Sequence, residues 1–225
     1  LMVEGTNDGE WSMVGHAVFA AEAYRSPMKT PKPTIQGMQS AVVVGPPGEE
    51  IHTDEFGRIR VQFHWDREGG HDDNSSCWMR VSQGWAGAGY GMITIPRVGQ
   101  EVLVSFLEGD PDQPLVVGRV HGASTPAPFP LPGGRDRSGW RSRSTGSAGG
   151  HEIVFDDRAR HERLTLHASR DLEKIVRQRE VETTGGDRRS TVGGQLSATI
   201  GGEDRSAVGG VHAVGAVRDR GAGQQ

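Results

Sequence analysis

The amino-acid sequence predicts an all-β protein, with a small Greek-key barrel followed by a β-helix that several copies of the chain build together. Three observations support this fold class. Short alternating or β-branched segments separated by turn residues fill residues 41–122, with no helix of note between them. A proline-rich segment follows at 123–140. An eight-residue repeat with regularly spaced Gly-Gly pairs then begins at Gly185.

The composition fits a modest core joined to an extended, repetitive part. Of the 225 residues, 34 are glycine and only 34% are hydrophobic, which is too little apolar material for one large core. The net charge of −4 gives no argument for nucleic acid or an anionic membrane as a partner. No apolar run reaches the roughly 18 residues that cross a bilayer. No signal-peptide pattern is present, so we expect any export to proceed without one.

Residues 1–40 are predicted to be the end of a preceding domain and a connector. An apolar run ends at Pro27, and Pro31 and Pro33 follow it. Closely spaced prolines exclude a helix and favour extended backbone.

The barrel is predicted over residues 41–122. The β-branched run 41–45 forms one strand, and residues 57–65 alternate as a half-buried antiparallel strand. In that second strand the inward set is Ile59, Val61, Phe63 and Trp65, and the outward set is Arg58, Arg60, Gln62 and His64. Further strands are expected at 77–83, in two pieces of 91–110 broken by Pro96 and Gly99, and within 110–122. The single cysteine, Cys77, excludes an internal disulfide and is predicted to be a small buried residue.

Residues 123–140 are predicted to be a semi-rigid linker, because four prolines lie close together in it. Residues 141–184 are predicted to be irregular strands leading into the repeat. The clearest are at 152–157 and 163–169. We interpret 171–184 as strand rather than helix, because Ile175, Val176 and Val181 are β-branched.

The octad repeat over residues 185–216 is predicted to form the β-helix. Its Gly-Gly pairs, which supply turns because glycine reaches positive φ without steric cost, begin at Gly185, Gly193, Gly201 and Gly209. The β-branched residues that precede the later pairs are predicted to face the interior: Val192, Ile200 and Val208. Small residues two positions earlier share that face. After Gly210 the pattern fades, and residues 217–225 are expected to be a frayed tail.

A single chain cannot stabilise these octads. Burying one β-branched side chain contributes about 1.5–3 kcal/mol, whereas ordering eight residues costs about 1–2 kcal/mol of backbone entropy each. A single-chain ribbon would also leave its strand edges open. The sequence therefore predicts an intertwined homotrimer. Calcium-binding β-rolls use a nine-residue repeat with other offsets, and a flexible Gly/Ser linker has no reason to keep valines in phase with glycines.

Chemical sites are weakly indicated. Carboxylates that might form a glycoside-cleaving pair lie in polar loops, where solvated surface charge is expected: Asp54, Glu55, Asp66, Glu68, Asp72 and Asp73. His64, His71 and Cys77 lack the spacing of common zinc sites. We therefore predict no catalytic residues, no metal and no cofactor.

Single-strand binding is a further alternative for a barrel of this kind, through basic grooves and stacking aromatics. The residues that would serve are Arg58, Arg60, Arg80, Trp65, Trp78, Trp85 and Tyr90. Because Trp65 is predicted to lie in the core and acidic residues are interleaved with the arginines, no nucleic acid is expected as a partner.

Several stretches resemble the VgrG family, the spike proteins of bacterial type VI secretion, which are similar to the puncturing spike of contractile phage tails. GPPGEEIHTDEFGRIRVQFHWDREG and SQGWAGAGYGMITIPRVGQEVLVSFLEGDPDQPLVVGRVHG resemble the barrel of that family. RSRSTGSAGG, HASRDLE and the octads resemble its stem, and YRSPMKTPKP resembles the end of its hub domain. The resemblance runs from about Tyr24 onward, and only the end of the hub is covered.

The resemblance implies an oligonucleotide/oligosaccharide-binding (OB) barrel followed by an intertwined trimeric β-helix. It implies a structural spike component rather than an enzyme, seated on a tube of ring-shaped hexamers and tipped by a protein of the PAAR class. Such a spike assembles in the bacterial cytoplasm and is secreted on firing, carrying effectors into a target cell envelope. The alternatives are an OB module for single-stranded nucleic acid or polysaccharide, and the carrier part of a spike whose cell-wall-degrading activity lies elsewhere.

Overall fold

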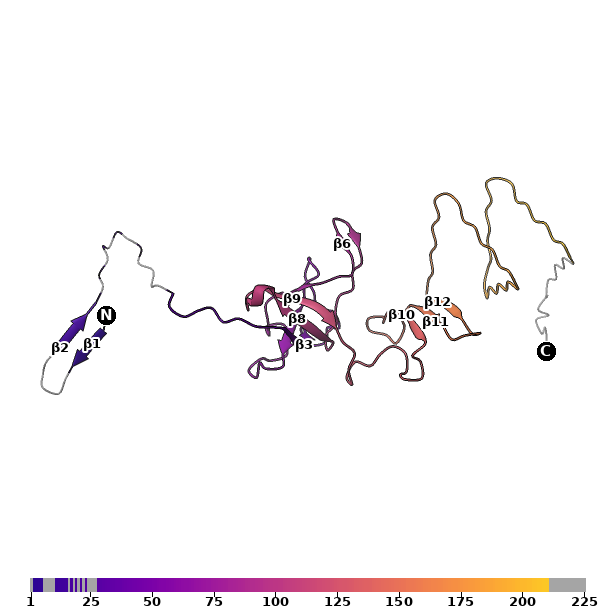
Figure 1. The fold of residues 1–225 in the computed structure, drawn as a ribbon. Coiled ribbons are helices and arrows are strands. Elements are labelled where there is room, and N and C mark those ends of the chain that lie inside the picture. Colours follow the sequence, from indigo (N-terminus) through magenta and orange to yellow (C-terminus); the bar gives the residue numbers. More distant parts are fainter. Residues whose placement is uncertain are drawn as a thin grey trace, which may run out of the picture. The chain divides into compact units, whose positions relative to one another are not determined.

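The computed structural model describes residues 2–5, 11–15, 17, 19, 21, 23 and 28–210. β-Strands form nearly all of the regular structure in these residues, and the one helical element among them is a 3-10 turn at Leu107–Gly109 (Figure 1). The all-β prediction is confirmed. Within the described residues, no helix has the length and apolar character of a bilayer-spanning segment.

The chain divides into two units, Leu1–Leu172 and Glu173–Gln225. In the first unit, β1 (Met2–Gly5) and β2 (Trp11–Val14) form an antiparallel hairpin. The predicted connector is described from residue 28 onward and has extended backbone up to β3. Residues 24–27 of the predicted hub end and connector lie outside the described residues, as do the predicted frayed tail and the last part of the octad region.

The barrel is a five-stranded sheet with the strand order β4-β3-β8-β9-β5. Its strands are β3 (Met38–Val44), β4 (Arg60–Phe63), β5 (Arg80–Val81), β8 (Glu101–Phe106) and β9 (Pro114–Arg119). All neighbours pair antiparallel except β5 and β9, which pair parallel. The two outer strands meet where Ile59 and Met79 exchange main-chain hydrogen bonds of 3.0 and 2.8 Å. This bridge closes the sheet into a barrel.

The barrel core follows the alternation expected of strands that face a closed interior. In β8, Val102, Val104 and Phe106 are buried while the residues between them are partly exposed. The core contains ten buried residues from β3, β4, β8, β9 and the Ile59–Met79 bridge: Ala41, Val43, Ile59, Val61, Phe63, Met79, Val102, Val104, Phe106 and Val116. The aliphatic part of the predicted core is therefore confirmed.

The end of β4 departs from the prediction for two side chains. The strand stops at Phe63, where the Asp66 N–H donates to the Phe63 carbonyl (3.2 Å) and turns the chain. Trp65 therefore leaves the core face and is 60% exposed, although its ring stacks on Phe63 at 5.0 Å. Gln62 was predicted to face solvent and is instead buried, because its Nε2 donates to the Asp66 carbonyl (3.0 Å) and Gly69 packs directly against it.

Two further strand predictions and the predicted burial of Cys77 are corrected. The stretch 77–83 contributes only the two residues of β5, and Cys77 at its start is exposed rather than buried. Residues 92–98 form no strand, which fits the missing N–H of Pro96. The glycine-rich stretch before them forms a hairpin of β6 (Ala86–Gly87) and β7 (Tyr90–Gly91).

A second sheet follows the barrel, with the order β10-β11-β12. Its strands are β10 (Arg137–Arg141), β11 (Glu152–Asp156) and β12 (Arg163–His167), and both pairs are antiparallel. β10 begins inside the stretch predicted as linker, while β11 and β12 lie where strands were expected. Residues 171–184 form neither strand nor helix; they have extended backbone with a bend at 177–178.

Candidate functional site

Two features, each described by itself, are the candidates for function: one face of the β10–β12 sheet in the first unit, and the octads in the second unit. Cross-strand partners in an antiparallel sheet lie on the same face. The register aligns Ser138, Phe155 and Leu164 in one row, and Trp140, Ile153 and Leu166 in another row on that face. We call this surface the apolar sheet face. Trp140, Leu164 and Leu166 on it are 68%, 64% and 61% exposed, so the described residues of the first unit do not cover it.

The opposite face of the same sheet is polar and tied by ion pairs. Asp156 is buried and accepts from Arg158 through both nitrogens (2.8 and 2.9 Å) and from Arg137 Nε (3.1 Å). The bonds from Arg158 lower the pKa of the Asp156 carboxyl most, burial opposes the shift, and Arg137 adds to the lowering. At the other end of the sheet Arg141 Nε pairs with Glu152 at 2.7 Å. The sheet is therefore amphipathic, with its polar face already satisfied within the chain.

We expect this ion-pair cluster to make the sheet acid-sensitive. The folded pKa of Asp156 lies below its unfolded value near 3.9, so its stabilisation is complete above about pH 5 and is lost as pH falls through the unfolded value toward the folded pKa. Asp156→Asn should lower the melting temperature at neutral pH and weaken the pH dependence below about pH 5. Circular dichroism melts across that range test this, with exposed Asp157→Asn as the matched control. Equal acid sensitivity in the parent and Asp156→Asn would contradict the assignment.

Among the residues that the structure describes, the octads up to Gly210 pair with no strand. Bends fall at each of the four Gly-Gly pairs, and the residues between them belong to no strand or helix. The three β-branched side chains predicted to face an interior are 48%, 55% and 53% exposed: Val192, Ile200 and Val208. The repeat thus has bends at the predicted positions, and its apolar residues are not buried by the described part of the second unit.

The octad glycines do not have the positive φ that was the expected reason for glycine at the turns. None of the glycines at Gly185, Gly193, Gly201 or Gly209 has a φ in the left-handed region, and a Cβ added to any of them would meet nothing within 4 Å. The bends form without positive φ, so backbone freedom in the isolated chain does not require glycine there. A requirement for glycine must come from neighbours that a single chain does not supply.

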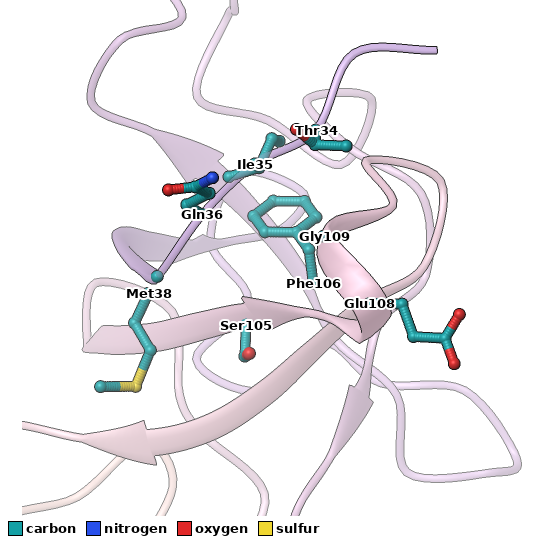
Figure 2. Close-up of a pocket in the computed structure, with 9 residues that line it drawn as sticks. Thr34, Ile35, Gln36, Met38, Ser105, Phe106, Glu108 and Gly109 are labelled. Atoms are coloured by element: carbon teal, nitrogen blue, oxygen red, sulfur yellow. The ribbon is translucent and has the colours of Figure 1, made fainter. Parts of the chain in front are cut away.

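The connector is fastened to the barrel at the turn between β8 and β9. Lys32 Nζ lies 2.5 Å from Asp110 and 2.7 Å from Asp112, and the Ile35 N–H donates to the Gly109 carbonyl (2.8 Å). These bonds raise the pKa of Lys32, chiefly through Asp110. A cavity of about 550 Å³ lies beside this junction. Figure 2 shows the Phe106 ring next to Ile35, with the Glu108 carboxylate pointing away from them.

The loop carboxylates considered for catalysis hold turns. Asp54 accepts from the N–H groups of Phe56 and Arg58, and its second oxygen lies 2.6 Å from Arg58 Nε. Asp66 accepts from two N–H groups of its own loop, and Asp72 accepts from the Asn74 N–H (2.8 Å). Their hydrogen bonds are therefore those of loop structure.

The residues considered for zinc do not come together in the part of the chain that the structure describes. His64, His71 and Cys77 are all exposed, and no group of three or more His, Cys, Asp or Glu side chains there is placed to hold a metal ion.

The aromatic and basic residues considered for nucleic acid are separated by the fold. The Arg60 guanidinium lies over the Trp78 ring at 4.6 Å, while Trp65 stacks on Phe63. Trp85 and Tyr90 lie apart from these, on the β6–β7 hairpin. The structure thus does not bring the set into one groove.

Sequence reasoning missed two features. The apolar sheet face depends on the register that aligns Trp140 with Ile153 and Leu166, and the only signal in the sequence was the alternation in β12. The ion pairs of Lys32 with Asp110 and Asp112 could not be predicted from the local sequence pattern, because these residues are far apart in the chain.

Comparison with known proteins divides the chain in the same way. Residues 48–121 match the family model of the type VI secretion system/phage-baseplate injector OB domain, and residues 138–222 match that of the bacteriophage T4 gp5 C-terminal trimerisation domain. The barrel and the β10–β12 sheet with its octads are therefore these two domain types.

Curated relatives match across both parts. Type VI secretion system spike protein VgrG4b of Pseudomonas aeruginosa is 54% identical over 170 residues, which is 75% of this chain and 21% of the relative. VgrG1c of the same organism is 50% identical over 180 residues, or 78% and 24%. Spike protein VgrG3 of Vibrio cholerae is 45% identical over 161 residues, or 72% and 16%. The chain thus spans less than a quarter of the length of these relatives.

Proposed function

Because the chain belongs to the VgrG family of type VI secretion spike proteins, we propose that it forms the shaft of such a spike as a homotrimer. In this role it punctures the target envelope and delivers effectors by mechanical force. The observation that carries the proposal is the uncovered apolar sheet face, which continues in sequence into octads without strand partners. A row of exposed large apolar side chains is typical of an interaction surface, and the matched trimerisation domain favours two further copies.

In the proposed trimer, the three β10–β12 sheets turn their apolar faces toward a common axis. The octads then wind around that axis, with Val192, Ile200 and Val208 inside. Strand pairing runs between chains, which supplies the hydrogen-bond partners that a single chain lacks. A closed prism has no open edge at which strands can separate, so it resists force along its length.

The partners proposed for the spike follow from the family. The hub end would meet a tube of ring-shaped hexamers, and the distal end would carry a PAAR-class tip protein and effectors. Assembly would take place in the bacterial cytoplasm, with export when the sheath contracts. The polar loops of the barrel support a mechanical rather than a catalytic role, because Asp54, Asp66 and Asp72 are engaged in holding their own turns.

The direct test is the mass of the intact chain in solution. We expect sedimentation equilibrium to give three times the chain mass of 24.2 kDa, and the trimer to resist dissociation because its contacts are distributed along the whole stem. A chain that sediments as a monomer over the accessible concentration range would contradict the proposal.

A further inference from the structure

The β6–β7 hairpin presents apolar side chains away from the barrel core. Figure 1 shows it extending from the five-stranded sheet. The Trp85 and Tyr90 rings meet edge to face with centroids 5.7 Å apart, yet they are 65% and 62% exposed. Met92 and Ile93 follow and are also exposed. Residues 84–93 carry no charged side chain, so this protruding segment, which we call the aromatic hairpin, is uncharged.

Glycines hold the rings of the aromatic hairpin in place. A Cβ on Gly87 would lie 2.3 Å from the Tyr90 ring, so only glycine lets that ring lie against the backbone. Gly91 has a φ of +135°, and a Cβ there would lie 2.6 Å from the Trp85 carbonyl. The hairpin therefore orders its own aromatic surface without help from the core, as a preformed contact element does.

A groove begins at the base of the aromatic hairpin. It has a volume of about 780 Å³ and is lined by Met92, Pro126, Pro128 and Trp140, among others. Arg119 borders it and donates to the Thr94 carbonyl. Trp140 belongs at the same time to the apolar sheet face. Apolar side chains thus occur from the hairpin through Met92 to Trp140, with polar and charged side chains between them in the groove.

We propose that the aromatic hairpin of one copy of this chain occupies the groove of the next copy. The inference rests on the proposed homotrimer and extends its contact from the stem to the barrels. Trp140 lies both in the groove and on the apolar sheet face. If another copy of the chain buries that face in the trimer, this copy lies beside Trp140 and is therefore the favoured occupant of the groove. Each chain also has one hairpin and one groove, and such head-to-tail contacts close into a ring under threefold rotation.

The charges in this region support the same occupant. The uncharged hairpin would meet the methionine, proline and tryptophan side chains of the groove, whose lining also includes the charged residues Glu101, Arg119 and Arg141. The aromatic hairpin has no lysine or arginine with which to hold a phosphate backbone, so stacking of single-stranded nucleic acid on Trp85 and Tyr90 lacks its electrostatic component.

Disulfide or short bis-maleimide cross-linking of the full chain tests the proposal. In a Cys77→Ser background, Ala88→Cys places a thiol at the exposed hairpin tip, and His121→Cys places one at the groove rim. We expect covalent trimers on denaturing gels. Ala88→Cys combined with Glu108→Cys, which lies at the other cavity beside the connector, is the matched control and should give at least about tenfold less cross-linked product.

The outcomes separate this inference from the proposed function. If the uncross-linked chain is a trimer but Ala88→Cys/His121→Cys links no better than the control, the groove assignment is wrong and the trimer stands. Cross-links confined to single chains would show that the hairpin fills its own groove and would also overturn it. If the chain sediments as a monomer, the proposed function itself fails.

A double variant provides a second test. Trp85→Ala/Tyr90→Ala, introduced into the Ala88→Cys/His121→Cys chain, should reduce cross-linking by at least about tenfold while sedimentation still shows the trimer formed by the stem. Because both rings are exposed, the barrel should keep its circular dichroism spectrum. Unchanged cross-linking in this variant would contradict a docking role for the rings.

Discussion

Replacing Ile200 with aspartate is expected to abolish stem assembly while the barrel remains folded. In the proposed trimer the change brings three carboxylates to the axis, and burying an unpaired charge costs several kcal/mol for each chain. In the isolated chain Ile200 contacts no core and is 55% exposed, so the same change should leave a monomer undisturbed. Sedimentation equilibrium should show a monomer, and the melting transition of the barrel should persist.

The matched control is Thr199→Asp, one position earlier. Successive side chains of an extended segment point to opposite sides, so this aspartate should face solvent and leave the trimer intact. If Ile200→Asp and Thr199→Asp assemble equally well, Ile200 does not face an interior. The pair of variants therefore tests which side of the octad is buried, independently of whether the chain tolerates an added charge.

The second large effect is expected in the barrel, from Phe106→Ala. Phe106 is 7% exposed and its ring lies 6.0 Å from that of Phe63. Truncating a buried phenylalanine costs about 3–5 kcal/mol, which in a domain of this size lowers the melting temperature by at least about 12 °C. Thermal melts followed by circular dichroism should show this for the barrel transition, while sedimentation should still show an assembled stem.

Phe56→Ala serves as the control for that variant. Phe56 is 73% exposed in a loop, and its replacement should change the stability of the barrel by no more than about 0.5 kcal/mol. A barrel that melts at the same temperature with Phe106→Ala and Phe56→Ala would contradict the core assignment. Loss of the trimer together with the barrel would show that the stem depends on a folded barrel.

The sequence predicted the parts of the fold in which local pattern and burial agree. Val102, Val104 and Phe106 alternate cleanly, and β8 follows that alternation. At the end of β4 the pattern continued to Trp65, but a loop interaction ended the strand: the Asp66 turn and the close approach of Gly69 placed Gln62 in the interior. The end of β4 and the burial of Gln62 thus depend on Asp66 and Gly69, which lie outside the alternating segment.

The sequence predicted the turns of the octads and the need for more than one chain, but it did not predict the arrangement of the apolar residues. The octad period and its Gly-Gly pairs indicated turns, which appear as bends, and the energetic argument indicated that one chain is insufficient. The apolar sheet face was not predicted, because aligning Trp140 with Leu166 requires the pairing of three strands. The strands expected in the octads are absent from the described single chain, since in the proposed trimer their hydrogen-bond partners belong to other chains.

The attachment of the connector at Lys32 and Ile35 has a consequence for how tension would spread through the barrel. Both residues are bound to the turn that joins β8 to β9, while the connector itself continues into β3. A pulling force on the chain upstream of the barrel is therefore shared by β3, β8 and β9. It does not act on the hydrogen bonds of β3 alone. When a force is spread over several strand pairs, many hydrogen bonds must break together, and the sheet therefore ruptures later under load.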